Sequence, residues 1–207
     1  MTYAHTFKSC MVAQFSLDPD TALMIEVSRG NTASFDLLLQ RHRTPVVNHL
    51  YRLVRNRAIA EELAQEVFIR VYRSRSRYQA EAKFTTWLFR ITTNMALNWR
   101  RDTRREFSHV AIDQDVRKLR RREFPDQTPR ADKRLLDEDR AREVRAAIDT
   151  LPQKQLAAVL LHKYEGMEYA QIAGVLGCTI PALKSMLFRA YATLRQRLAH
   201  FVPQQAA

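Results

Sequence analysis

The chain has 207 residues, 46% of them hydrophobic, which is enough apolar material for one large or two small domains. It carries 34 lysines and arginines against 22 acidic residues, and the net charge of +12 indicates an extended polyanion, nucleic acid rather than membrane, as the partner. No apolar run approaches the about 18 residues that a membrane span needs. Because no apolar core with a cleavage site follows Lys8 either, we expect a cytoplasmic protein without membrane insertion.

The residue types present argue against metal, cofactor and catalysis. The two cysteines, Cys10 and Cys178, form no CxxC pair, the six histidines are scattered singly, and the four glycines form no phosphate-cradling loop. No carboxylate cluster or nucleophile constellation stands out. We therefore expect no enzyme activity, no cofactor, no metal and no small-molecule substrate.

In chain order, helix start and stop residues appear after an aperiodic tail at 1–17, which we expect to be disordered. Asp18 can cap a first helix and Gly30 can end it, and Asn31 can cap the next. Within that next helix Pro45 is expected to restart the helix, because proline fits a first turn best.

A third helix is expected from about Ala58 to Arg73, with apolar residues at i, i+3 and i+4 on one face. Three such helices with short connections predict a bundle, which a fourth helix from Phe84 to about Arg104 completes. The sequence therefore predicts an all-α fold of two small helical domains joined by a flexible basic linker. The expected division is a tail at 1–17, a first domain at 18–104, a linker at 105–134, a second domain at 135–200 and a tail at 201–207.

The fourth helix combines an apolar stripe with a basic, amide-rich stripe on nearly the opposite face, and Trp87 lies at the edge of the latter. Rings that stack on bases and amides that bond base edges suit single-stranded nucleic acid. The alternative is a solvated helix face beside a core tryptophan, and Leu97 interrupts the polar stripe without explanation. The polar stripe is formed by Arg90, Asn94, Asn98 and Arg101.

The linker contains Pro125 and Pro129 and a basic block at 117–122, and it lacks helical periodicity. The block can contact nucleic acid or an acidic channel, or it can serve only as a soluble tether.

The second domain ends in a pattern typical of a helix-turn-helix, because an apolar stripe from Tyr169 to Leu176 stops at Gly177 and a second helix follows after three residues. Thr179 can cap that second helix, and Pro181 fits its first turn. An ordinary packed helical hairpin needs the same stripes, but not the short turn or the outward-facing polar residues. Those outward residues are Lys184, Ser185, Phe188 and Arg189.

With both domains placed, the chain resembles a bacterial RNA polymerase sigma factor of the extracytoplasmic function group of the sigma-70 family, which has only regions 2 and 4. The resemblance covers residues 20–105 and 135–198. The motifs that carry it are Ala60–Tyr72, Phe84–Asn94, Leu151–Pro152, Glu168–Ala173, Leu183–Ser185 and Leu187–Ala190.

The resemblance implies a factor that binds core RNA polymerase, through its β and β′ subunits, and directs promoter-specific initiation, with a cognate anti-sigma factor as a further partner. It implies that Glu62, Gln65, Glu66, Ile69 and Arg70 dock on the clamp helices of the largest polymerase subunit. It implies that the −10 element is bound and melted by Phe84, Trp87, Arg90, Asn94, Asn98, Arg100 and Arg101, with the loop before Phe84. It implies that the −35 element is read by Thr179, Lys184, Ser185, Phe188 and Arg189.

Two positions depart from the family pattern. Met186 stands where arginine commonly follows the Lys-Ser pair, and Pro181 stands where a small glycine is usual. If Met186 faces DNA, Met186→Arg should tighten −35 binding, whereas a core-facing position would make arginine destabilising.

Two other classes of protein compete with this interpretation. A stand-alone helix-turn-helix repressor or response-regulator output domain explains residues 150–198 but not the polar stripe beside Trp87, and it should dimerise on a palindrome. A nucleic-acid enzyme lacks a catalytic constellation here.

Overall fold

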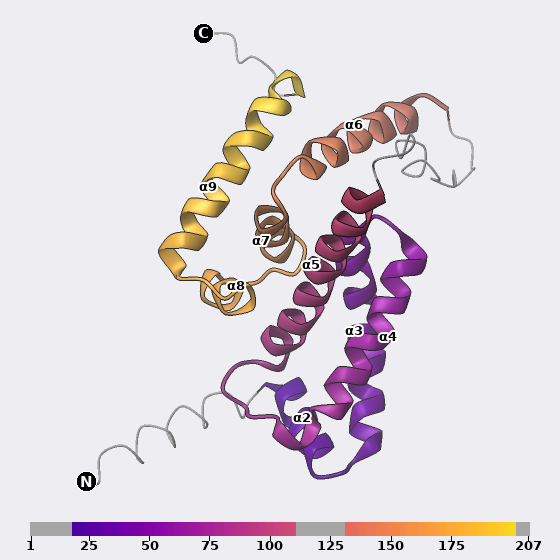
Figure 1. Ribbon diagram of the computed structural model, residues 1–207, viewed down its shortest axis with the longest axis vertical. Coiled ribbons are helices and arrows are strands. Elements are labelled where there is room, and N and C mark those ends of the chain that lie inside the picture. The colour runs from indigo at the N-terminus through magenta and orange to yellow at the C-terminus, as the bar shows by residue number, and fades with distance from the viewer. Residues whose placement is uncertain (1–17, 111–130, 202–207) are drawn as a thin grey trace.

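The computed structural model describes residues 18–110 and 131–201, and within these ranges every regular element is a helix (Figure 1). The predicted all-α class is confirmed. The α-helices are α2 (Pro19–Ser28), α3 (Thr32–Val54), α4 (Arg57–Arg73), α5 (Phe84–Val110), α6 (Ala131–Asp149), α7 (Gln153–Lys163), α8 (Tyr169–Leu176) and α9 (Ile180–Arg197). Two short 3-10 helices, η1 (Arg75–Arg77) and η3 (Ala199–Phe201), complete the set.

Helices α2 to α5 form the first bundle, and its first two caps are those the sequence predicts. The Asp18 carboxylate accepts the Thr21 N–H at 3.0 Å, and the Asn31 side chain accepts two N–H groups of the first turn of α3. The core of this bundle is mostly apolar, with a few buried polar side chains such as His49 and Thr93, which bond each other. Its most buried large side chains are Met24, Leu38, Leu50, Leu53, Phe84 and Leu88.

Helix α3 does not restart at Pro45, and that prediction is wrong. The helix runs unbroken from Thr32 to Val54 with Pro45 inside it. Proline there leaves the Arg41 carbonyl without its helical donor, a cost of about 3 kcal/mol in an exposed helix. Val46 and Leu50 on the same turns are completely buried, and burying such side chains contributes about 1.5–3 kcal/mol each. Packing on the core therefore outweighs the local preference.

The second domain contains the predicted helix-turn-helix. Gly177 ends α8 in the left-handed conformation, at φ 62°, and only Cys178 and Thr179 separate it from α9. The Thr179 hydroxyl accepts the Ala182 N–H at 3.4 Å and so caps α9, and Pro181 lies in the first turn. The three-residue turn predicted from Gly177 is confirmed.

The two domains pack against each other, which nothing in the sequence pattern indicated. Helix α8 packs against α5, and α7 contacts both α3 and α5 (Figure 1). An Arg55–Asp149 ion pair of 2.9 Å joins the end of α3 to the end of α6. The Glu165 carboxylate lies 3.5 Å from the buried His49 ring and 3.8 Å from Arg52.

Of the predicted linker, residues 105–110 continue α5 and residues 131–134 begin α6. The basic block at 117–122 and both linker prolines lie outside the described residues, as do 1–17 and 202–207.

Over the described ranges no single helix is long and apolar enough to cross a membrane. Helices α8 and α9 taken together have the length and composition of a span, but they are bent by 96° relative to each other.

Candidate nucleic-acid and polymerase interfaces

The α4 face, which we define as Glu62, Gln65, Glu66, Ile69 and Arg70, lies on the outside of the first bundle. Its members are exposed or half-exposed, and 43% of the Ile69 side chain is open to solvent. The Arg70 Nε donates to Glu66 Oε1 at 3.0 Å, a spacing that supports the helix itself. Beside this face runs an apolar groove of about 550 Å³ between α3 and α4. Its apolar lining includes Phe35, Leu39, Phe68, Ile69 and Tyr72.

An exposed isoleucine beside an apolar groove, rimmed by charges of both signs, is typical of a protein-docking surface rather than of a nucleic-acid surface. The α4 face is therefore suited to a protein partner.

The α5 face, which we define as Arg90, Asn94, Asn98 and Arg101, is exposed along α5, as the stripe predicts. Three of these residues share a hollow of about 370 Å³ with Arg70 and Arg73 of α4. Among the described residues neither Arg73 nor Arg90 has an acidic partner, so the hollow carries positive charge that is not neutralised. Arginine side chains in such a hollow can bind a phosphate backbone, and the two asparagine amides can hydrogen-bond the bases beside it.

Aromatic residues close the N-terminal end of the α5 face. The Trp87 ring is half-buried, 5.0 Å from the Tyr78 ring and 6.0 Å from the Phe84 ring. Phe84 itself is fully buried, with its ring 5.4 Å from that of His42. In this structure the Phe84 side chain is therefore not open to DNA, and a contact between Phe84 and the −10 element stays a prediction. Its burial fits its place one helical turn before the buried Leu88.

The two arginines at the far end of this helix have different surroundings. Arg100 donates to the Leu53 carbonyl at 3.1 Å and thereby satisfies an end group of α3. Arg101 is exposed and lies 3.3 Å from Asp102. Arg101 can turn to a phosphate, whereas Arg100 also has a structural role.

The recognition face, which we define as Lys184, Ser185, Phe188 and Arg189, is exposed on α9. Phe188 is 73% exposed, an unusual state for a large aromatic side chain, and Arg189 donates to the Ser185 carbonyl at 3.3 Å. Met186 lies between Ser185 and Phe188 in the chain, and it is half-buried and packs on the domain core. Its packing favours the core-facing alternative for Met186, and a contact with DNA stays untested.

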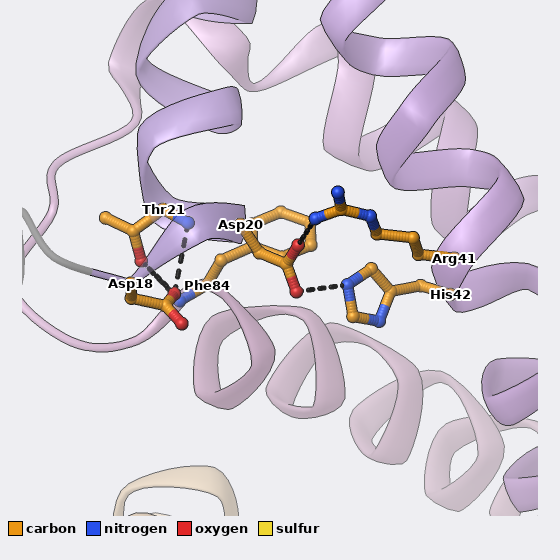
Figure 2. A network of polar contacts seen from close by, with 6 residues as sticks. All are labelled: Asp18, Asp20, Thr21, Arg41, His42 and Phe84. Carbon is orange, nitrogen blue, oxygen red and sulfur yellow. Dashed lines mark hydrogen bonds and ion pairs between the residues drawn. The ribbon is translucent and has the colours of Figure 1, made fainter.

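A polar network behind the start of α5 was not predicted from the sequence (Figure 2). It joins Asp18, Thr21 and the Phe84 N–H on one side of α2, and Asp20, Arg41 and His42 on the other. Asp18 was identified only as a helix cap, because sequence spacing does not show which distant N–H a hydroxyl meets.

The contact between the two domains leaves the α4 face, the α5 face and the recognition face exposed. Helix α8 packs on a different side of α5, where the Thr86 methyl is 4.0 Å from the position that a Cβ on Gly174 would take. Leu97 falls near this side by helical spacing, which accounts for its place beside the polar stripe.

The chain matches two family models and several known proteins. Residues 38–106 match sigma-70 region 2, and residues 141–194 match sigma-70 region 4. The ECF RNA polymerase sigma factor SigE of Mycolicibacterium smegmatis is 36% identical over 185 residues, which are 88% of this chain and 69% of that protein.

Two solved structures share the fold. CnrH in complex with the cytosolic domain of CnrY has a TM-score of 0.65 at 20% identity and covers 88% of this chain and 99% of that one. RpoE in complex with the anti-sigma factor NepR, from Bartonella quintana, has a TM-score of 0.62 at 22% identity and covers 80% of this chain and 96% of that one.

Proposed function

The chain belongs to the extracytoplasmic function group of the sigma-70 family, and from this we propose that its two domains divide the reading of a promoter between them. As a sigma factor it directs promoter-specific initiation of transcription by RNA polymerase. Its role is regulatory, and we assign bond formation to the polymerase rather than to any residue of this chain.

The first domain, in this proposal, binds and opens the −10 element with the α5 face. The observation that carries the assignment is the cationic hollow in which Arg73 and Arg90 surround Asn94 and Asn98, next to the half-buried Trp87. Side-chain amides can hydrogen-bond the edges of unpaired bases, and an aromatic ring can stack on them. In a duplex, Watson–Crick pairing already occupies the edges that the amides would bond.

The second domain reads the −35 element as duplex. Lys184 and Ser185 are in the first turns of α9, the part of a recognition helix that reaches base edges in the major groove. The exposed Phe188 ring supplies an apolar contact for a thymine methyl, and Arg189 a bidentate donor for guanine or phosphate.

The α4 face docks on core polymerase, at the clamp helices of the β′ subunit. Exposed Ile69 between Gln65 and Arg70 offers an apolar centre with a polar rim. A cognate anti-sigma factor is a second partner, by analogy with the complex of RpoE and NepR. Since polymerase and promoter are in the cytoplasm, we place the protein there.

The packed arrangement of the domains has to open on the promoter. The −10 and −35 elements are separated by roughly two turns of duplex, on the order of 70 Å. Helices α5 and α8 are in direct contact in this structure, so the two reading surfaces cannot be that far apart. We expect the two domains to separate when both elements are bound.

Run-off transcription with purified core polymerase tests the proposal. Core enzyme with this protein should give a promoter-specific transcript that core enzyme alone does not. Asn94→Ala should lower the yield from a linear duplex promoter about tenfold, since base contacts are worth about 1–3 kcal/mol, and should lower it little on a promoter with a pre-opened bubble. Equal losses on the two templates would remove Asn94 from strand opening. Dimeric binding to a palindrome without any transcript would instead favour a repressor.

A further inference from the structure

Helix α2 caps the start of α5 from outside. The Phe84 N–H donates to the Thr21 Oγ1 at 3.0 Å, and both residues are completely buried. Phe84 is the first residue of α5, so its N–H has no partner within its own helix. A buried N–H without an acceptor is costly, and the Thr21 hydroxyl is the acceptor provided here.

Asp18 fixes the direction of that hydroxyl. Thr21 Oγ1 donates its single proton to Asp18 Oδ2 at 2.6 Å, and the same oxygen accepts the Thr21 N–H at 3.0 Å. A hydroxyl has one proton, so once it is directed at Asp18 only the lone pairs remain for Phe84. The carboxylate therefore holds the hydroxyl in the orientation that accepts from α5 (Figure 2).

Asp20, on the opposite side of α2, ties that helix to α3. Its two carboxylate oxygens lie 2.8 Å from Arg41 Nη1 and 2.8 Å from His42 Nε2 (Figure 2). The His42 ring then packs 5.4 Å from the Phe84 ring. Residues from α2 and α3 thus hold the first residue of α5, through its backbone and through its side chain.

This arrangement positions Trp87, which lies at the N-terminal end of the α5 face. Trp87 is three residues after Phe84 and packs on both Phe84 and Tyr78. Burial raises the pKa of Tyr78, and its neighbours in that environment are Thr21 and Asp18. The loop that carries Tyr78 and the helix that carries Trp87 therefore both meet Thr21.

We propose that Thr21, oriented by Asp18, is a positioning residue for strand opening: it fixes Trp87 and the loop from Tyr78 to Lys83 in the geometry that captures an unpaired base. The inference rests on the proposed −10 role of the α5 face. Thr21 is buried and touches no DNA, so its effect passes through the start of α5.

The test compares Thr21→Val, which keeps the shape and removes the hydroxyl, with Thr21→Ser, which keeps the hydroxyl. Thr21→Val should lower transcription from a linear duplex promoter about tenfold more than from a pre-opened bubble, from the cost of an unsatisfied buried N–H. Thr21→Ser should retain at least half of the duplex activity. Ser28→Ala is the matched control, because among the described residues that hydroxyl bonds the Ile25 carbonyl of its own helix and nothing on α5, and it should leave both templates unchanged.

Equal losses from Thr21→Val on the two templates, or no loss on either, would overturn the inference. If Thr21→Val does not fold, Asp18→Ala replaces it: the hydroxyl then keeps its place but loses its fixed direction, and the duplex-specific loss should be smaller but of the same kind. Asn94→Ala, run in parallel, separates the two proposals. A duplex-specific loss in Asn94→Ala without one in Thr21→Val or Asp18→Ala overturns this inference alone, whereas no such loss in Asn94→Ala overturns the −10 assignment on which it rests.

Discussion

Reversing one charge at the domain contact should shift the free protein toward an open form. Arg55 and Asp149 form a 2.9 Å ion pair between the domains, with side chains 30% and 48% exposed. Exposed pairs of this kind contribute about 0.2–1 kcal/mol, and Arg55→Asp replaces the attraction by a repulsion of similar size. The expected shift is therefore about 1 kcal/mol, or about fivefold in the ratio of open to closed molecules.

Both partners can be exchanged with little damage to their helices. Arg55 is the C-cap of α3 with φ 58°, a conformation that aspartate adopts more readily than most residues. Asp149 is the last residue of α6, where the helix dipole favours a cation over an anion. The position of an aspartate at this helix end is thus explained by Arg55 and not by the helix.

Small-angle scattering of the free protein at low salt is the assay. Arg55→Asp and Asp149→Arg should each increase the radius of gyration, and the double exchange, which restores an ion pair, should return it to the starting value. The affinity for a short −35 duplex should be equal in all four proteins, because the recognition face is open in the closed form. If the single variants stay compact, the pair does not hold the domains together. If they bind the −35 duplex more tightly, the contact masks α9, contrary to the structure.

Two substitutions in the second domain test its local geometry. Gly177→Ala should lower the free energy of unfolding by about 1–2 kcal/mol, because alanine resists φ 62°, whereas Gly174→Ala, at an ordinary helical position with free space up to 4.0 Å, should not; equal melting temperatures would contradict this. Met186→Arg should lower the melting temperature without tightening −35 binding, since Met186 packs on the core, and a gain in affinity at unchanged melting temperature would show that the side chain faces DNA.

Elements whose signals are local could be predicted from the sequence. Asp18 and Asn31 cap α2 and α3, and Gly177 ends α8, because each feature depends only on residues within one helical turn. The exposed stripe from Arg90 to Arg101 follows from helical spacing in the same way.

Features that depend on tertiary contact could not be predicted. Pro45 has a strong local preference that burial of its neighbours overrides. Glu165, Arg52 and Arg55 are ordinary surface charges in the sequence, and only the approach of the second domain makes them partners. The sequence predicted the recognition face but did not decide whether Met186 faces DNA or the core. A half-buried side chain at the edge of a helix face cannot be recognised from the spacing of apolar residues.

Helix α5 makes three different kinds of contact, on three sides, whereas the sequence pattern distinguished only an apolar side and a polar side. One side, with Leu88 and Met95, packs in the first core, and the polar stripe faces the hollow shared with α4. A third side, at Thr86, meets α8. Because the end of α5 that Thr21 caps also carries Thr86, the docking of the second domain and the geometry of the −10 site share one rigid element. Because the α5 face is already exposed while α8 packs on α5, we expect that separating the domains on a promoter requires no change at the proposed −10 site.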